Sequence, residues 1–494
     1  MLLVRFYDDR LAQASYLIGC AASGTALVVD PNRDAEQYVA AAAANGMRIT
    51  HVTETHIHAD FVSGARELAR RTGATLLLSD AGDADWKYAF AASEGAVPLV
   101  DGSRFEVGRI RIDVMHTPGH TPEHIVFLVT DGAAADRPMG AITGDFIFVG
   151  DVGRPDLLER AARVAGTMES SARALFRSIA RFKALPDYLQ IWPGHGSGSA
   201  CGKSLGAVPQ TTLGYERLFN WALAITDEDE FVDAVLTGQP EPPTYFAEMK
   251  RVNKMGPAVL GGFRHPERLP GSRLAALLAE GALVIDTRHA ADFAAAHVPG
   301  TINIPLNKSF VTWMGWLVPY DRDYYLIVDD EAGHADRAAR EAALIGLDRL
   351  AGYFGDDVVA EWQREGRTLE RVAQITPAEL AERMRRGDVA VIDVRGQSEW
   401  DAGHIEGARH IPVGMLDAEL ARLPRDVTLV MQCQGGGRSS IASSLLQARG
   451  VKQVVNLAGG LTAWERAGLP LTSPHGAPLE AAKAERPEHA GDRH

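Results

Sequence analysis

The stretch ETHIHADFVSG, residues 54–64, decides how the first half of the chain folds. It follows the apolar run ITHVT and places His56, His58 and Asp60 at alternate positions. Alternate side chains of an extended segment face one way, so these three can converge on one point. Phe61 then stands at the position where one more metal ligand is expected. The stretch predicts a metal site at the end of a β-strand, with an aromatic ring beside it.

Three later segments carry further residues that can bind a metal. They are HTPGHTPEH (His116, His120 and His124), TGDF (Asp145) and WPGHG (His195). The histidine spacing in the first is helical, but Pro118, Gly119 and Pro122 exclude a regular helix. These histidines are therefore not expected to share a face. A single loop histidine more often caps or hydrogen-bonds its own loop, but four such clusters beside Gly or Pro favour a metal centre.

The surrounding residues, 1–245, alternate short apolar strands with helices. TALVVDP and TLLLSD are typical of strands, and AEQYVAAAAANG and FVSGARELARRTG of helices, the first ending at Gly46. This alternation predicts an α/β domain. The segment after it is rich in Gly and Pro, as in NKMGPAVLGGFRHPERLPG, and predicts a linker over residues 246–268.

An internal repeat organises the rest of the chain. VIDTRHAADFAAAHVPGTINIP (Val284–Pro305) returns 107 residues later, without a gap, as VIDVRGQSEWDAGHIEGARHIP (Val391–Pro412). Each copy continues into an apolar strand and a helical pattern, which predicts two α/β domains over residues 269–370 and 371–472. The tail, 473–494, has few bulky apolar residues and is predicted to be disordered.

The three cysteines differ in their surroundings. Cys433, in MQCQGGGRSS, ends a predicted strand, and the glycine-rich loop and helix start after it can stabilise a thiolate or persulfide. Cys201 stands six residues after His195 on a Gly- and Ser-rich loop, so it can reach the metal pocket. Lys203 is expected to lower its pKa. A persulfide relay and a small buried filler both remain open for Cys201, whereas Cys20, in SYLIGCAAS, is expected in the core.

THIHAD, PGHTPEH, TGDFIFVGDVGRPD and WPGHGSG resemble the metallo-β-lactamase fold, an αββα sandwich, and within it the persulfide dioxygenase branch. The neighbouring glyoxalase II type hydrolases bind two metals through His-x-His-x-Asp-His, whose last histidine would fall at Phe61. The resemblance thus implies one Fe(II), held by His56, His120 and Asp145. Such a set leaves three adjacent positions open, enough for a sulfur substrate and O₂. The other cluster residues would orient the ligands: His58, Asp60 and His195.

The two copies of the repeat and the ending AGGLTAW resemble the rhodanese domain, a doubly wound α/β fold. Its active loop, Cys-x4-Arg, corresponds to Cys433 and Arg438. Related phosphatases use Cys-x5-Arg, so the shorter loop favours sulfane sulfur over phosphate. The first copy has Asp330 in place of the cysteine and Ala335 in place of the arginine. Because a carboxylate cannot carry a persulfide, that copy is predicted to be an inactive rhodanese with a structural or docking role.

The order dioxygenase, inactive rhodanese, active rhodanese resembles the persulfide dioxygenase–rhodanese fusions of bacterial sulfide detoxification. The resemblance implies Fe(II)- and O₂-dependent oxidation of a low-molecular-weight thiol persulfide, of the glutathione or coenzyme A type, to sulfite. Cys433 would pass sulfane sulfur to sulfite to give thiosulfate, or run the reverse reaction. Arg154, in GRPD, matches a substrate-facing position of the family, the alternative being a surface pair with Asp156.

Two rival functions remain. One is a dinuclear zinc thioester hydrolase joined to a sulfurtransferase, against which Phe61 counts. The other is a non-oxidative function, in which the first domain is a binding module and Cys433 alone acts, as a sulfur carrier. The presence of His56, His120 and Asp145 counts against this second alternative.

Composition narrows the remaining choices. Apolar content of 46% and charged content of 23% are ordinary for a globular protein. The net charge of -14 argues against nucleic acid as a partner, and no apolar run approaches the roughly 20 residues of a membrane span. Three cysteines imply no disulfide framework, which favours the cytoplasm. The family resemblance implies a homo-oligomer.

Overall fold

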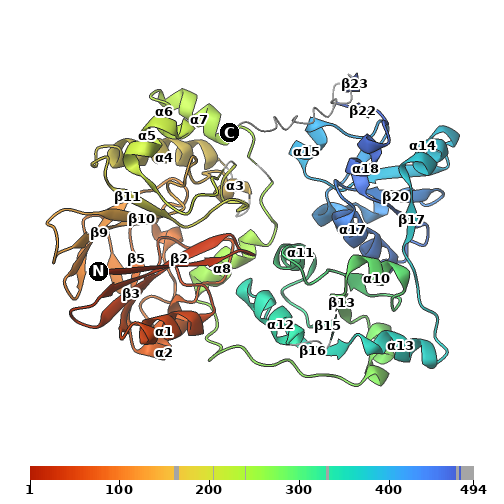
Figure 1. Cartoon of the computed structure of the whole chain (residues 1–494), viewed down its shortest axis with the longest axis horizontal. Helices are drawn as coiled ribbons and strands as arrows, with labels where there is room; N and C mark the ends of the chain where they lie inside the picture. The colour runs from red at the N-terminus through yellow and green to blue at the C-terminus, as the bar shows by residue number, and fades with distance from the viewer. Residues whose placement is uncertain (161–165, 204, 240, 330–332, 474–477, 480–494) are drawn as a thin grey trace, which may run out of the picture. The chain divides into compact units, whose positions relative to one another are not determined.

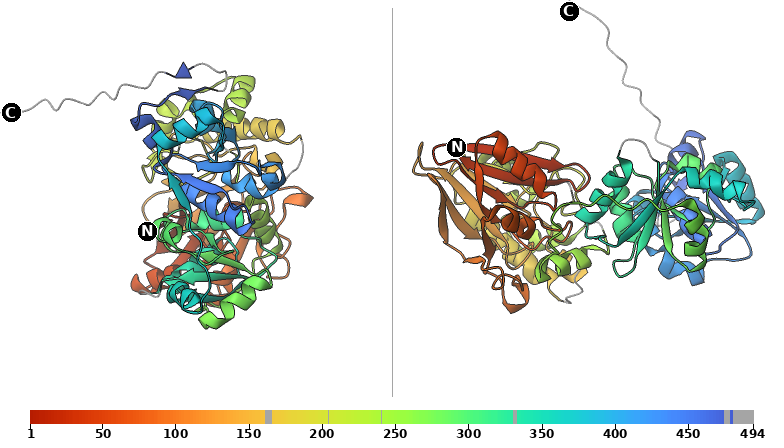
Figure 2. Two further views of the ribbon diagram at one scale, coloured as in Figure 1. Left: turned by 90° about the vertical axis from the view of Figure 1, so that its right-hand side faces the viewer. Right: turned by 90° about the horizontal axis from the view of Figure 1, so that it is seen from below.

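The structure, a computed structural model, describes residues 1–160, 166–203, 205–239, 241–329, 333–473 and 478–479. The chain forms two compact units, drawn from three directions in Figures 1 and 2. Unit 1 comprises Met1–Arg268, Leu306–Tyr324 and Asp330–Tyr353. Unit 2 comprises Leu269–Pro305, Tyr325–Asp329 and Phe354–His494. The first copy of the repeat therefore contributes residues to both units.

Unit 1 contains two six-stranded sheets, in the orders β1-β2-β3-β4-β5-β6 and β12-β11-β10-β9-β8-β7. The strands of the first are β1 (Leu2–Asp8), β2 (Gln13–Cys20), β3 (Thr25–Val29), β4 (Arg48–Thr53), β5 (Thr75–Ser79) and β6 (Val97–Leu99). Those of the second are β7 (Arg104–Val107), β8 (Ile110–His116), β9 (Ile125–Asp131), β10 (Gly140–Gly144), β11 (Gln190–Pro193) and β12 (Thr211–Thr212).

Helices cover the outer faces of the two sheets, as Figure 1 shows. The first sheet carries α1 (Ala35–Ala44) and α2 (Ala65–Thr72). The second carries α3 (Leu157–Arg160), α4 (Met168–Phe182), α5 (Leu213–Phe219), α6 (Trp221–Ala224) and α7 (Glu228–Leu236). Three apolar cores join the four layers: one around Tyr38, one between the sheets around Phe127 and Trp192, and one around Phe182. The predicted αββα sandwich is confirmed.

Two segments of unit 1 differ from the sequence-based prediction. Helix α2 begins at Ala65 and not at Phe61, because the Gly64 N–H donates to the Pro31 carbonyl and a Cβ on Gly64 would overlap the backbone of the same loop. Residues 54–64 are therefore free to form a ligand-bearing loop. The predicted linker contains helix α8 (Phe246–Met255), whose buried residues Phe246, Met249 and Asn253 follow a helical period.

The two copies of the repeat fold alike. Helices α10 (Ala290–Ala295) and α15 (Gln397–Ala402) keep the 107-residue offset, as do β14 (Ile302–Asn303) and β19 (Arg409–His410). The sheets have the orders β14-β13-β15-β16 and β17-β21-β20-β18-β19, and the second is parallel throughout. The sandwich is thus followed by two rhodanese-like α/β domains, as predicted.

The other elements of the two copies complete this pattern. The strands are β13 (Leu283–Asp286), β15 (Tyr324–Val328), β16 (Leu350–Gly355), β17 (Ala373–Ile375), β18 (Val389–Asp393), β20 (Thr428–Gln432) and β21 (Val454–Leu457). The helices are α9 (Leu274–Ala279), α11 (Phe310–Leu317), α12 (His334–Leu344), α13 (Asp357–Arg364), α14 (Pro377–Arg386), α16 (Leu416–Glu419), α17 (Gly437–Ala448) and α18 (Gly460–Arg466).

Some sequence-based predictions concern residues outside the described part of the chain. Asp330, at the position of the missing cysteine, is one of them. The tail is another, apart from Ser473 and the short pair of β22 (Leu471–Thr472) with β23 (Pro478–Leu479). The predicted domain boundaries stay predictions.

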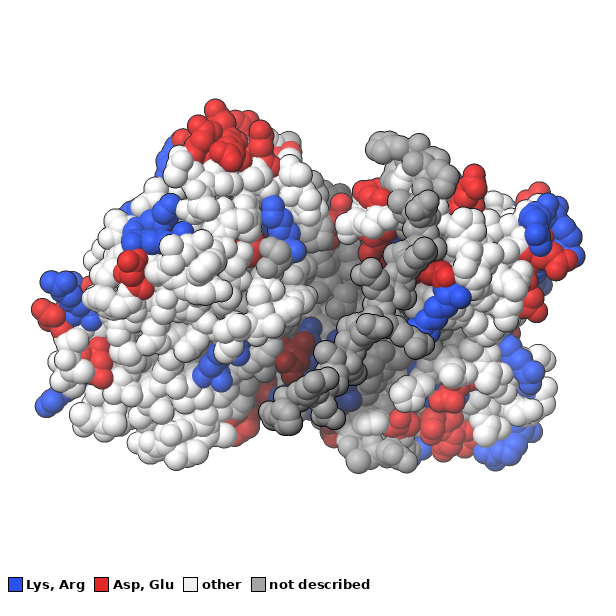
Figure 3. All heavy atoms as spheres, turned by 45° about the horizontal axis from the view of Figure 1, so that its top comes forward, with Lys and Arg blue, Asp and Glu red and all other residues white. Residues whose placement is uncertain are grey.

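Charged side chains are mixed over the surface. On the face drawn in Figure 3, basic groups stand singly or in small clusters, several of them beside acidic ones. Ion pairs at the surface of unit 1 include Arg173–Glu169 and Arg181–Asp101. Within the described residues, no helix combines the length and the apolar character needed to cross a membrane.

His297 gives unit 2 a pH-sensitive buried group. Its ring is 1% exposed and stacks on Phe293, with centroids 3.8 Å apart, and its Nδ1 hydrogen-bonds the Phe293 carbonyl at 2.9 Å. His404 repeats this arrangement on Trp400 in the second copy. Burial lowers the pKa of His297 to about 4.

The stability of the protein should therefore fall in acid through His297. The unfolded chain takes up a proton near pH 6.5, whereas the folded chain does so only near pH 4. The contribution of His297 to the free energy of unfolding is thus complete above about pH 6.5 and is lost as the pH falls towards 4. Urea unfolding at pH 7 and pH 5 should show a smaller loss for His297→Gln than for the unaltered protein. An identical loss in both would contradict this.

Candidate metal centre and cysteine loops

Three loops at strand ends bring together the three predicted metal ligands. His56 follows β4, His120 lies between β8 and β9, and Asp145 follows β10. Their ligand atoms lie within 4.8 Å of one another, and each residue is at most 2% exposed. Asp145 Oδ2 is 3.9 Å from His56 Nε2 and 3.6 Å from His120 Nε2. As expected, the other two histidines of that loop point elsewhere: His124 Nε2 accepts the Asp145 N–H, and His116 hydrogen-bonds a loop carbonyl.

Hydrogen bonds on the far side of each ring set its orientation. Thr55 gives its hydroxyl proton to a carboxylate, so its Oγ1 accepts from His56 Nδ1 at 2.9 Å. His120 Nδ1 donates to the Arg154 carbonyl at 3.0 Å. A ring that donates through Nδ1 carries its lone pair on Nε2. Both histidines therefore present a lone pair towards Asp145.

The donor set fits a divalent transition metal. His56 Nε2 and both Asp145 oxygens are buried without a hydrogen-bond partner. Burial lowers the pKa of His56 and His120, so both imidazoles are neutral. Burial opposes ionisation of Asp145, but the imidazoles, His195 foremost, hold its pKa well below its usual value. Two neutral imidazoles and a carboxylate without partners are the ligands that such a metal requires.

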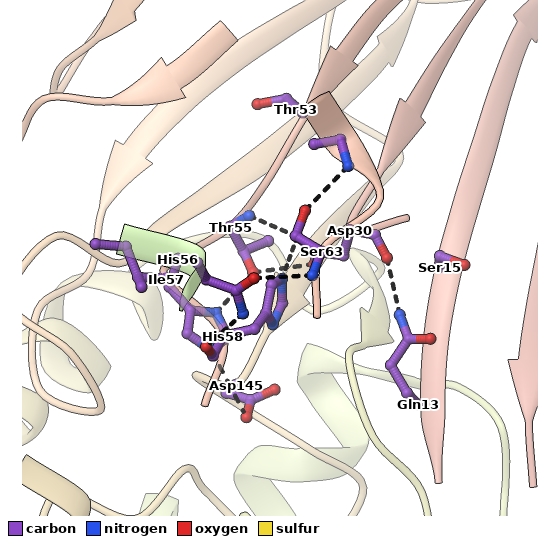
Figure 4. A network of polar contacts seen from close by, with 12 residues as sticks. Gln13, Ser15, Asp30, Thr53, Thr55, His56, Ile57, His58, Ser63 and Asp145 are labelled. Carbon is purple, nitrogen blue, oxygen red and sulfur yellow. Dashed lines mark hydrogen bonds and ion pairs between the residues drawn. The ribbon is translucent and has the colours of Figure 1, made fainter. Parts of the chain in front are cut away.

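Asp30, which sequence reasoning missed, holds the ligand loop from behind (Figure 4). Its oxygens accept the Thr55 N–H at 2.6 Å and the Thr55 hydroxyl at 3.0 Å, and Oδ1 lies 3.1 Å from His58 Nε2. Burial opposes protonation of His58, but Asp30 and Glu54 raise its pKa to about 9. His58 is therefore held by Asp30 through Nε2. Asp30 has a φ of 52°, a left-handed conformation that is uncommon outside glycine.

Phe61 fills the space next to His58. Its side chain is 0% exposed, and its ring lies 4.4 Å from the imidazole, centroid to centroid. Asn253 of α8 fixes the backbone here by donating to the carbonyls of His58 and Phe61 and accepting the Ser63 N–H. Asn253 lies in the predicted linker, and no sequence pattern marks it as a residue of the site. Asp30 could have been found, because it ends the strand next to the one that leads to His56.

A second group of potential ligands lies beside the first. Asp60, His195 and Cys201 offer ligand atoms within 4.8 Å of one another. His195 Nδ1 donates to the Ala12 carbonyl at 2.8 Å, and its Nε2 lies 3.2 Å from Asp60 Oδ2. Neither Asp60 oxygen has a hydrogen-bond partner. The loop of Cys201 thus reaches the metal pocket, as expected from the sequence.

The expected effect of Lys203 on Cys201 is wrong. Burial raises the pKa of Cys201 to about 12. The Lys203 ammonium instead donates to the Ala234 carbonyl at 2.7 Å and lies 4.0 Å from the centre of the Trp221 ring. Cys20 is 4% exposed in the core between the two sheets, where it was expected.

Arg154 joins the loops of His120 and Cys201. Its guanidinium, 0% exposed, donates twice to Asp156 at 2.7 Å and once to the Ala200 carbonyl. Its backbone N–H donates to the Cys201 carbonyl, and its own carbonyl accepts from His120. The pair with Asp156 was the alternative to a substrate-binding role, but it is buried and not at the surface. Substrate binding by Arg154 stays a prediction.

Cys433 sits in an anion-stabilising loop at the end of β20. Its Sγ is 3.1 Å from the Gly436 N–H and 3.3 Å from the Ser439 hydroxyl, and both can donate to it. Gly436 has a φ of 98°, which favours glycine. Arg438 pairs with both oxygens of Glu399, at 2.5 and 2.7 Å. Ser439 and Glu399 were not identified from the sequence.

Comparison with known proteins agrees with this architecture. The model of the metallo-beta-lactamase superfamily matches residues 8–195, and that of the rhodanese-like domain matches 272–360 and 376–467. A crystal structure of a metallo-beta-lactamase from Staphylococcus aureus subsp. aureus COL is 42% identical, with a TM-score of 0.64. The match covers 72% of this chain and 99% of that one. The chain belongs to the metallo-beta-lactamase superfamily. It carries two rhodanese-like domains after the metallo-beta-lactamase fold.

Two curated relatives each match one part of the chain. The hydroxyacylglutathione hydrolase of Rhodospirillum rubrum is 32% identical over 180 residues, which are 36% of this chain and 60% of the relative. The sulfurtransferase of Allochromatium vinosum is 34% identical over 106 residues, which are 21% of this chain and 99% of the relative. The chain thus spans less than two thirds of the first relative and nearly all of the second.

Gly153 offers a test of the ligand geometry. A Cβ at this position would overlap the Asp145 carbonyl oxygen and crowd His120. Gly153→Ala should therefore displace Asp145 and lower the metal content of the purified protein at least tenfold. Gly150→Ala, on the same loop, meets nothing within 4 Å and should cost only backbone strain at its φ of 76°. Metal content equal in the two variants would contradict the assignment.

Proposed function

We propose that the chain is a non-haem iron persulfide dioxygenase joined to a rhodanese sulfurtransferase, acting in sulfide and persulfide detoxification. The observation that carries the proposal is the buried set of His56, His120 and Asp145, whose ligand atoms lie within 4.8 Å of one another. Those of His56 and Asp145 have no hydrogen-bond partner. Phe61 supports a single metal, because an apolar ring occupies the position of a further ligand. Bound at these residues, Fe(II) would supply open positions for a sulfur substrate and O₂, and a redox-active ion through which O₂ oxidises the sulfur.

The side chains around the triad would bind and orient the substrate. Asp60, His195 and Cys201 form the adjoining wall, and each is at most 7% exposed, which keeps bulk water away. His195 is held by the Ala12 carbonyl through Nδ1, and its Nε2 faces the pocket beside Asp60 and Asp145, where it would donate to a persulfide. The Cys201 thiol stays protonated at neutral pH, because burial raises its pKa to about 12. A relay through Cys201 would need a neighbour to take that proton. His195 already carries one, because Asp145 raises its pKa well above the usual value despite burial.

The sulfur-transfer half would run through Cys433. Its thiolate attacks the sulfane sulfur of R–S–SH, which forms Cys433–S–SH and releases the thiolate R–S⁻. Sulfite then attacks the outer sulfur, giving thiosulfate and regenerating the cysteine. The Gly436 N–H and the Ser439 hydroxyl stabilise the sulfur anion in both steps. The same persulfide would serve the reverse reaction, from thiosulfate to thiol persulfide.

The partners in this proposal are small molecules. They are a persulfide of the glutathione or coenzyme A type, O₂, and sulfite or thiosulfate. We place the reaction in the cytoplasm and in a homo-oligomer.

Oxygen uptake tests the dioxygenase half. The Fe(II)-loaded protein should consume O₂ when glutathione persulfide or coenzyme A persulfide is added. Cys433→Ser should keep this uptake, because the cysteine lies outside the metal centre. His56→Ala, with its fold checked by circular dichroism, should lose at least a hundredfold in rate. Absence of uptake with several thiol persulfides, despite bound iron, would contradict the proposal.

A second candidate function is a dinuclear zinc thioester hydrolase joined to the sulfurtransferase. Asp60, His195 and Cys201 favour it, since together they offer a second set of ligands. Similarity to the hydroxyacylglutathione hydrolase is compatible with it. The two functions differ in their metal content and in the role of Phe61.

Metal analysis of Phe61→His separates the two functions. In the dioxygenase the unaltered protein should hold one iron, and the new imidazole next to Asp60 should add a second metal, zinc included. Two zinc ions per chain in the unaltered protein, with thioester hydrolysis and no uptake of O₂, would establish the hydrolase instead.

A further inference from the structure

Helix α12 of the inactive rhodanese-like repeat ends against the metal-ligand loop. The Val62 N–H, next to Phe61, donates to the carbonyl of Leu344, the last residue of α12, at 2.8 Å. The last carbonyls of a helix have no partner within the helix, so this bond satisfies both sides. Gly346 follows with a φ of 76°, and a Cβ there would lie 3.1 Å from Val62. The helix end and the ligand loop are thus in close contact within unit 1.

Arg33 ties the same helix to the loop that holds Asp30. Its guanidinium donates to both oxygens of Asp348, at 2.6 and 2.8 Å, and to the carbonyls of Ala343 and Ala258. Arg33 is 4% exposed. The Asp348 side chain is 34% exposed, so the pair is buried only on the arginine side. A bidentate arginine–carboxylate pair fixes orientation as well as distance. Arg33 stands three residues after Asp30, which binds the backbone ahead of His56, so this anchor lies close to the first ligand.

A second anchor leads from α12 to the other side of the pocket. Glu341 is 2% exposed and pairs with Arg10 at 2.5 Å. Arg10 lies two residues before Ala12, whose carbonyl orients His195. Arg340 adds a contact to Asp34, beside Arg33. The helix therefore touches the two loops that orient His56 and His195 from behind.

We propose that α12 and the segment that follows it are a positioning element of the metal centre. The principal contact is Arg33, which binds the Ala343 carbonyl of the helix and Asp348 just beyond its end. The inference rests on the proposed metal site and deepens it. It gives the first repeat a role that needs no cysteine, because the contacts come from the helix and the segment after it and not from the loop before it. Arg33 acts through the backbone around Asp30 and touches neither substrate nor metal.

Metal affinity of the full-length protein tests this. Cobalt(II) is titrated into the metal-free protein, and its absorption reports both affinity and coordination. Arg33→Ala should weaken binding about tenfold and change the spectrum, as is typical when support behind a ligand is lost. Arg33→Lys should fall between, since lysine cannot form the bidentate pair. The matched control is Asp323→Asn, which breaks an exposed pair with Arg349 in the same repeat and should leave both readouts unchanged.

The outcomes separate a positioning role from a structural one. The melting temperature of each metal-free variant is also measured, as a control for loss of stability. A lower melting temperature with unchanged cobalt affinity and spectrum would overturn the proposal and leave the contact structural. If Arg33→Ala does not fold, Asp348→Asn, which keeps one acceptor, carries the same comparison. If the unaltered protein binds cobalt and His56→Ala does not, the metal site itself is established. If the unaltered protein does not bind cobalt, both the metal site and the positioning role are contradicted.

Discussion

The metal centre depends on hydrogen-bond acceptors that face one another in a buried pocket. His56 Nε2 and the two oxygens of Asp145 have no partner, and the neighbouring carboxylate of Asp60 has none either. An unsatisfied buried polar group costs about 1–3 kcal/mol, and a carboxylate costs more. A cation bound among these atoms would remove that cost, because the same lone pairs would then be ligands. The loops that carry His56, His120 and Asp145 thus hold these acceptors around the place where a cation would bind.

Acceptors that repel one another must be held from outside the pocket. Asp30 holds the backbone ahead of His56 from a strained left-handed conformation, the Arg154 carbonyl holds His120, and the Ala12 carbonyl holds His195. Strain of this kind persists where the surroundings over-determine it, and it is concentrated at functional sites. The two rhodanese-like copies have different roles in this proposal. In the second copy, Cys433 receives hydrogen bonds from its own loop. In the first copy, helix α12 contacts the loops behind the metal centre.

The residues that the structure brings together at the candidate metal centre could be predicted from the sequence. Alternation in residues 54–64 and the strand-end positions of His120 and Asp145 predicted a shared site, and the gapless repeat predicted two similar domains. Residues that act only through tertiary contacts could not be predicted from the sequence. Asn253 binds the ligand loop from a helix almost two hundred residues away, and nothing local marks it. Lys203 is adjacent to Cys201 in sequence, but its ammonium is held by another helix. Proximity along the chain does not set the direction of a side chain.

The most direct test of the central claim is electron paramagnetic resonance of the anaerobic Fe(II)-loaded protein with nitric oxide in place of O₂. One metal held by His56, His120 and Asp145 leaves positions for a gas and a sulfur ligand together. We expect one iron–nitrosyl signal per chain, and we expect that signal to change when a thiol persulfide is added. The Asp145→Ala variant should show no such signal. A signal that persists in Asp145→Ala, or one that persulfide leaves unchanged, would contradict it.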